Sequence, residues 1–142
     1  MPHAERTVSI AAPVDEVFAF FTDPAHETTW RSGVKEMHAE GEPAVGTVVH
    51  QTVAGPMGRG IAADIEITDY RPGQAYGFQG ISGPVRPVGS YTFASSAAGT
   101  EVTFRLDCDL SGIKGKVLSK QVQRSMDAEM ADLDTAKRLL EG

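Results

Sequence analysis

His50 is the residue of this chain whose type and setting best suit proton transfer. It lies within the mainly apolar segment TVVHQTV, residues 47–53. An imidazole at the wall of a pocket can act as a general base and remove a proton next to a carbonyl group. That role requires His50 to face inward, because on the outer face of a strand it would be an ordinary solvated histidine. Tyr76 and Tyr91 are further candidates for moving a proton in the same reaction.

Metal-dependent and nucleophilic chemistry are not expected from the remaining reactive residues. The four histidines, at positions 3, 26, 38 and 50, show no compact metal-ligand spacing, so we expect neither a metal nor a cofactor. Cys108 falls on an apolar strand face, where a buried thiol is usually inert. The sequence places no histidine convincingly beside it, so a cysteine nucleophile is not expected either.

Five charged residues in two alternating segments could be taken for an acid–base set. They alternate with apolar residues, however, which predicts that they occupy the solvent-facing side of a sheet. Cross-strand charge pairing is then the simpler interpretation of their presence. The residues concerned are Asp64, Glu66, Arg105, Asp107 and Asp109.

The composition predicts one globular domain over residues 1–142, with 41% hydrophobic and 23% charged residues. The net charge is −6 and the basic residues are scattered, which argues against nucleic acid and anionic membrane surfaces as partners. A single cysteine excludes an internal disulfide. No apolar run is long enough for membrane insertion, and MPHAERTVSI lacks the apolar core of a signal peptide, so a cytoplasmic location is the default expectation.

The first thirty residues predict a strand followed by two short helices. Residues 6–11 alternate and are rich in β-branched types. Pro13 suits the first position of a helix, and apolar residues then recur at helical spacing until about Thr22. Asp23 and Pro24 form a new start signal, an N-cap acceptor followed by proline, so a second helix should reach about Trp30. The two helices should form a V-shaped clamp.

The rest of the chain predicts an antiparallel sheet and one long helix. Between residues 34 and 110, six alternating segments are separated by turn signals rich in glycine and proline. One of them, residues 61–70, shows continuous alternation and is expected to form a single strand. From about 115 to 140 the apolar spacing becomes helical, which predicts a helix roughly 39 Å long. The fold class is therefore α+β, with a curved seven-stranded sheet wrapped around the terminal helix.

This order of elements resembles the Bet v 1-like helix-grip fold of the START-like (SRPBCC) superfamily, which includes polyketide cyclases, dehydrases and lipid carriers. The resemblance covers essentially the whole chain and rests on four stretches. They are VSIAAPVDEVFAFFTDPAHETTW, YRPGQAYGFQG, GSYTFASSAAGTEVTFRLDCDLSG and MDAEMADLDTAKRLLEG. The resemblance implies the fold, whereas the activity stays open because this architecture hosts carriers, receptors, cyclases and hydrolases.

The leading hypothesis is a protein that binds a small hydrophobic molecule, such as a lipid, polyketide or aromatic metabolite, between its sheet and its long helix. The alternatives are a polyketide cyclase or dehydratase, and a protein-interaction module without a ligand; either a monomer or a homodimer is compatible. Phe104, Leu106 and Leu133 face inward, but packing is the favoured role for them. The candidate ligand-binding residues are Phe20, Phe21, Trp30, His50, Thr52, Ile65, Tyr76, Phe78, Tyr91, Phe93, Phe104, Met126 and Met130.

Overall fold

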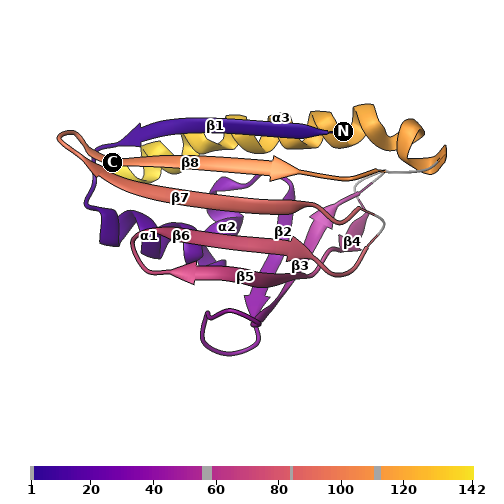
Figure 1. The fold of residues 1–142 in the computed structure, drawn as a ribbon, viewed down its shortest axis with the longest axis horizontal. Coiled ribbons are helices and arrows are strands. Elements are labelled where there is room, and N and C mark those ends of the chain that lie inside the picture. Colours follow the sequence, from indigo (N-terminus) through magenta and orange to yellow (C-terminus); the bar gives the residue numbers. More distant parts are fainter. Residues whose placement is uncertain (1, 56–58, 84, 111–112) are drawn as a thin grey trace.

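The computed structural model describes residues 2–55, 59–83, 85–110 and 113–142, and it describes no side chains for residues 113–117. One sheet and three helices make up this part of the chain (Figure 1). In chain order the elements are β1 (His3–Ile10), α1 (Val14–Thr22), α2 (Pro24–Trp30), β2 (Val34–Ala39), β3 (Val48–Ala54), β4 (Gly60–Ala62), β5 (Ile65–Arg71), β6 (Ala75–Gly80), β7 (Val88–Ser96), β8 (Gly99–Asp107) and α3 (Ile113–Glu141).

The break between α1 and α2 is built from the local signals that the sequence shows. The side chain of Asp23 accepts a hydrogen bond of 2.9 Å from the backbone N of Ala25, which caps α2 at its start. Pro24 follows as the first residue of α2, a position where its missing N–H costs nothing. The predicted stop near Thr22 and restart at Pro24 are confirmed. Pro13 precedes α1 as its N-cap and does not occupy the first helical position.

The sheet is antiparallel throughout, and its strands follow the order β1-β8-β7-β6-β5-β3-β2. This seven-strand path confirms the expected sheet. The short strand β4 lies off the path and pairs with β3. The prediction of one strand over residues 61–70 is wrong, because the ladder is interrupted at Ala63 and Asp64. There the backbone N of Ala63 bonds to the carbonyl oxygen of Gln51, and that of Asp64 bonds to the hydroxyl of Ser82.

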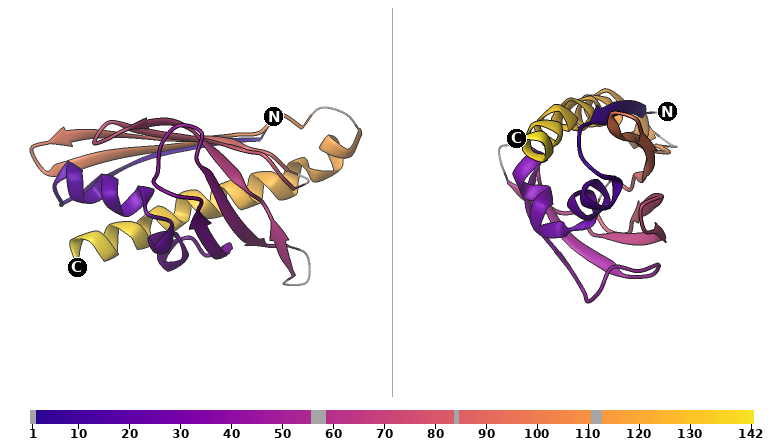
Figure 2. Two further views of the ribbon diagram at one scale, coloured as in Figure 1. Left: turned by 90° about the horizontal axis from the view of Figure 1, so that it is seen from below. Right: turned by 90° about the vertical axis from the view of Figure 1, so that its left-hand side faces the viewer.

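The helix α3 lies along the inner side of the curled sheet, and α1 and α2 lie on that same side (Figure 2). It has 29 residues, so it is roughly 43 Å long. Arg6 on β1 ties the sheet to the helix, since its Nη1 donates to the carbonyl oxygen of Met130 at 2.9 Å and its Nη2 pairs with Asp134. The buried stripe that α3 turns toward the sheet consists of Val122, Met126, Met130, Leu133 and Ala136.

Candidate functional site

A small cavity lies in the interior between the sheet and α2. Its volume is about 10 Å³, which is room for one water molecule. One side of it is aromatic and aliphatic, while the other side carries charged and amide groups. The lining residues are Glu27, Arg31, Met37, Gln51, Ile65, Tyr76, Phe78 and Tyr91.

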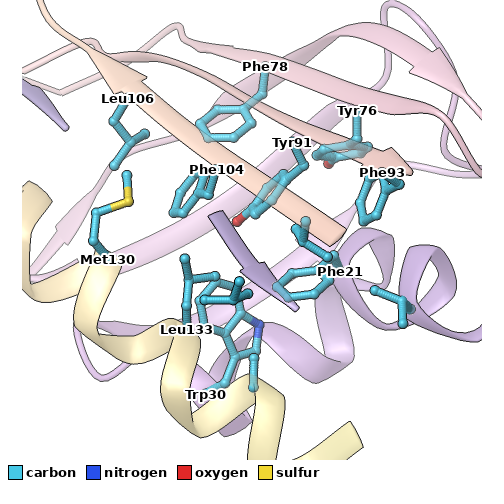
Figure 3. Close-up of a cluster of buried hydrophobic side chains, with 14 of the residues drawn as sticks. Phe21, Trp30, Tyr76, Phe78, Tyr91, Phe93, Phe104, Leu106, Met130 and Leu133 are labelled. Carbon is cyan, nitrogen blue, oxygen red and sulfur yellow. The ribbon is translucent and has the colours of Figure 1, made fainter. Parts of the chain in front are cut away.

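The register of the strands brings together the aromatic residues on one side of the cavity. Pairing across β5, β6, β7 and β8 places Tyr70 opposite Tyr76, Tyr76 opposite Tyr91, and Tyr91 opposite Phe104. Tyr91 and Phe104 stack with ring centroids 4.3 Å apart and planes 9° apart. Figure 3 shows Tyr76, Tyr91 and Phe104 together with Phe21 from α1. The ring of Phe21 lies 5.3 Å from that of Tyr91. Cross-strand aromatic pairs of this kind stabilise a sheet and form a continuous wall.

The polar side of the cavity is a buried charge cluster centred on Arg31. Its Nη1 lies 3.2 Å from Oε2 of Glu27, one helical turn earlier, and its Nε donates to Oε1 of Glu129 on α3 at 2.8 Å. Nη2 of Arg31 also pairs with Glu129, and Nη1 lies 3.4 Å from the amide oxygen of Gln51. Glu27 is 4% exposed and Arg31 is 9% exposed. The cluster therefore joins α2, α3 and β3 at the edge of the cavity.

Burial controls the protonation of this cluster. It raises the pKa of the Glu27 carboxyl to about 7, outweighing the opposing attraction of Arg31. Burial also acts to lower the pKa of Arg31, but Glu129 and Glu27 together hold that pKa above its usual value, so the guanidinium stays charged. The pKa of the Tyr91 phenol is raised well above its usual value by burial and then by Glu27, and that of Tyr76 is raised for the same reasons. Both phenols therefore remain hydrogen-bond donors at neutral pH.

The raised pKa of Glu27 predicts a pH-dependent stability. The folded state binds this proton more tightly than the unfolded state, whose carboxyl titrates near 4.5. The contribution of the Glu27 proton to the free energy of unfolding is complete below pH 4.5 and is lost as the pH rises to about 7. We therefore expect the free energy of unfolding of Glu27→Gln to fall less than that of the parent protein between pH 4.5 and 7, measured by urea titration at several pH values. Glu36→Gln, at an exposed position of β2, is the control, and an unchanged pH profile for Glu27→Gln would contradict the assignment.

The structure brings four of the sequence-predicted ligand residues to the cavity wall: Ile65, Tyr76, Phe78 and Tyr91. Seven others lie elsewhere. Phe20 is half-buried and stacks on His26 with ring centroids 5.0 Å apart. The other six are packed in the surrounding core, and for none of the seven is a ligand contact tested, so that role stays a prediction. These six are Phe21, Trp30, Phe93, Phe104, Met126 and Met130.

The structure places the two nominated residues His50 and Thr52 on the outer face of the sheet. The inward orientation expected of Thr52 is therefore wrong, whereas for His50 the sequence left the face open and the solvent-facing alternative is the one observed. Val49 is buried in the core and Gln51 lines the cavity, and alternation along β3 turns the residues between and beyond them outward. The His50 ring lies 2.8 Å from Asp64 through Nδ1 and 3.0 Å from Glu40 through Nε2. Hydrogen bonds to these two carboxylates raise the pKa of His50. A base on this face cannot reach a molecule in the interior.

The residues interpreted as non-catalytic agree with their expected faces. Cys108 is buried, and burial raises the pKa of its thiol, which makes it a poor nucleophile. Arg105 is exposed on the outer face of β8 and bonds to Asp107 at 3.0 Å. Among the residues that the structure describes, no three histidine, cysteine or acidic side chains lie together so as to hold a metal ion. No helix within that part of the chain combines the length and apolar character needed to cross a bilayer.

Sequence reasoning missed the charged half of the site. Glu27 and Trp30 are spaced i and i+3 on α2, and Arg31 follows at i+4 as the C-cap residue of that helix. Trp30 is 2% exposed. That spacing beside a buried tryptophan was the available signal, because it places a charge pair on an inward helix face. Nothing comparable marked Gln51 or Glu129. Gln51 reaches the cluster because β3 pairs with β2, and Glu129 reaches it because α3 packs against α2.

A larger groove lies outside the cavity, between the two short helices, the segment that joins β2 to β3, and the β5–β6 turn. Its volume is about 750 Å³ and it is open to solvent. Its surface is mostly apolar, with acidic residues interspersed. The lining residues are Asp15, Phe18, Ala19, Thr22, Asp23, Pro24, Ala25, Met37, His38, Ala39, Gly41, Glu42, Pro43, Tyr70, Pro72 and Gly73.

Comparison with solved structures places this architecture among known folds. The di-domain ARO/CYC StfQ from the steffimycin biosynthetic pathway aligns with a TM-score of 0.80 and 16% identity, covering 99% of this chain and 51% of StfQ. The protein TTHA0849 from Thermus thermophilus aligns with a TM-score of 0.76 and 21% identity, covering 97% of this chain and 94% of TTHA0849. A START superfamily protein from Mycobacterium smegmatis aligns with a TM-score of 0.76 and 12% identity, covering 97% of this chain and 98% of that protein. At these identities the likeness establishes the fold.

The sequence itself matches the model of one protein family over residues 1–137, and that family is described as polyketide cyclase / dehydrase and lipid transport. No curated protein matches the chain. The family match covers α1, α2, the whole sheet and nearly all of α3, so it includes every residue that lines the cavity. The chain is therefore a member of the polyketide cyclase/dehydrase and lipid transport family, and it has the START-like helix-grip fold.

Proposed function

We propose that the protein binds a small, largely apolar molecule between the sheet and the helices α2 and α3, with a polar group of that molecule held by Glu27, Arg31 and Gln51. The observation that carries the proposal is a buried charge cluster bordering a cavity in an otherwise aromatic interior. Taking such charges out of water costs several kcal/mol that well-packed apolar residues would avoid. That cost favours a role in recognition over a role in stability.

The chemistry of the two cavity walls defines the class of molecule. The cavity as it stands holds one water molecule, so a ligand can enter only if the side chains around it move apart. Ile65, Tyr76, Phe78 and Tyr91 would then offer apolar surface, and burying about 200 Å² of a ligand against them would contribute roughly 5 kcal/mol. The guanidinium of Arg31 and the amide of Gln51 can orient a carbonyl or hydroxyl group. The family description, which joins cyclases and dehydrases with lipid transport, supports a molecule of this apolar kind.

A neutral aromatic probe tests the proposal. N-phenyl-1-naphthylamine should show a saturable rise in fluorescence and should raise the melting temperature by several degrees, since a ligand at 100 times its Kd stabilises the folded state by about 2.7 kcal/mol. Ile65→Phe, which fills the cavity, should weaken binding, whereas Glu66→Gln on the outer face should not. The absence of binding, together with a molecular mass that depends on concentration, would favour the interaction module instead.

A cyclase or dehydratase is the second candidate, and Glu27 is the observation that favours it. A carboxyl group with a pKa of about 7 can exist in both protonation states at neutral pH, which general acid–base catalysis requires. In the dehydration of a β-hydroxyketone, the Glu27 carboxylate would take the proton from the carbon next to the ketone, and the electron pair of that C–H bond would form the new C=C bond. The C–O bond of the β-hydroxyl would break as Glu27 returns the proton to it, so the products are an unsaturated ketone and water. Glu27→Gln should then abolish turnover of a β-hydroxyketone while leaving the circular-dichroism spectrum of the folded protein unchanged. Retained turnover would exclude Glu27 from this role.

A further inference from the structure

Met37 is the residue shared by the outer groove and the interior cavity. Among the described residues that line either space, it is the only one that lines both. It lies on β2 opposite Gln51, a member of the charge cluster. Tyr70, which lines the groove, also contacts Tyr76, which lines the cavity. Their ring centroids lie 6.2 Å apart in an edge-on arrangement. The two spaces are thus separated by a thin layer of side chains.

The position of Met37 favours movement more than that of the other cavity residues. Its strand, β2, is the last in the order of the sheet and has only β3 as a neighbour. The β2–β3 register shifts between Val34 and Glu36, immediately before Met37. A methionine side chain is unbranched and adapts readily to different packing arrangements. Tyr91, by contrast, is 2% exposed and stacked on Phe104 within the central strands.

The charge of the groove restricts which molecules can occupy it. Three exposed carboxylates, those of Asp15, Asp23 and Glu42, lie along its lining. None of the described residues that line it is a lysine or an arginine. The floor between these acids is apolar and includes Phe18, Ala39 and Tyr70. Like charges placed together disfavour association, so an anionic group in the groove would be repelled.

We propose that the groove and the interior cavity are two parts of one binding site, that Met37 is the gate between them, and that the ligand is an elongated amphiphile whose outer end is neutral or positively charged. This inference rests on the proposed function, because it assumes that the interior takes a ligand. The inner end of the molecule lies near Arg31 and Gln51, its apolar middle passes Met37, and its outer end lies among the groove carboxylates.

A matched set of three dansyl probes tests the charge preference. N-dodecyl dansylamide, 12-(dansylamino)dodecylamine and 12-(dansylamino)dodecanoic acid share a fluorophore and a chain and differ in the charge of the far end. We expect the amine to bind about three- to tenfold more tightly than the acid at low salt, and the difference to shrink as salt is added. Asp15→Asn combined with Glu42→Gln should remove most of that preference. Equal affinity of the parent protein for amine and acid would overturn the inference about ligand charge.

Rapid-mixing kinetics with the amine probe test the gate. Met37→Ala should raise the association rate and Met37→Trp should lower it, each by about tenfold, and Glu36→Gln should leave the rate unchanged. If Met37→Trp does not fold, Met37→Ala still decides the question through its opposite effect. If the amine probe binds and its association rate does not depend on residue 37, Met37 is not a gate, and the proposed function is unaffected. If no probe binds the parent protein and Ile65→Phe changes nothing, the proposed function and this inference fail together.

Discussion

Replacing Arg31 with methionine should reduce the free energy of unfolding by about 3 to 5 kcal/mol at pH 8. Arg31 is the cation that the structure places between Glu27 and Glu129. Its removal leaves the buried carboxylate of Glu27 and the partly buried carboxylate of Glu129 without a counter-charge. The loss should be smaller at pH 5, because burial already favours the protonated form of Glu27, whose pKa is about 7. Urea unfolding followed by circular dichroism at both pH values measures the effect.

Two comparison variants separate charge imbalance from a general packing defect. The triple variant Glu27→Gln, Arg31→Met, Glu129→Gln removes all three charges and should recover at least half of the lost stability, since the cost lies in the unpaired carboxylates. Arg71→Ala breaks an exposed pair with Asp69 and should shift the unfolding midpoint little. If the triple variant is as unstable as Arg31→Met alone, the buried charges are not the cause.

Replacing Phe21 with alanine should cost about 3 to 5 kcal/mol of folding stability. Phe21 is 1% exposed and makes ring contacts with Trp30, Tyr91 and Phe93, at centroid distances of 5.3, 5.3 and 6.1 Å. The substitution would leave a cavity where α1 meets α2 and the sheet. The gain in helix propensity from alanine, about 0.5 kcal/mol, is too small to offset it.

Phe20 provides the matched control on the same helix. It is only partly buried, and its partners are Phe21 and the ring of His26. Phe20→Ala should therefore cost clearly less than Phe21→Ala, by at least about 1.5 kcal/mol in thermal or urea unfolding. Equal losses would mean that Phe20 carries as much of the clamp packing as Phe21, contrary to the burial of the two rings.

The two stability experiments and the binding experiments address different properties of one region. The clamp formed by α1 and α2 has an apolar side, represented by Phe21, and a charged side, represented by Arg31. The first is expected to hold the clamp on the sheet, and the second to present a polar group to the cavity. A variant such as Ile65→Phe is needed for the binding question because it changes the cavity and leaves both sides of the clamp in place.

Local sequence was sufficient to predict most of the fold. The end of α1 and the start of α2 are set by Asp23 and Pro24, which act through backbone geometry and a hydrogen bond within two residues. The sheet and α3 follow from apolar periodicity, which depends on which residues must leave water. The strand predicted over residues 61–70 was divided, because Ala63 and Asp64 bond to Gln51 and Ser82. Those partners are distant in sequence, so the local alternation of apolar and polar residues could not predict these hydrogen bonds.

The candidate site, like the fold, could be predicted from the sequence only in part. The sequence by itself indicated an aromatic interior and named Tyr76 and Tyr91, because large residues on the apolar face of a strand must be buried. Only tertiary structure decided that His50 faces outward, since the face of a strand depends on which neighbour the sheet buries. The charge cluster was likewise decided by tertiary structure. A helix surface normally holds charges in solvent, and Glu27 and Arg31 are buried because β2 and α3 pack against α2.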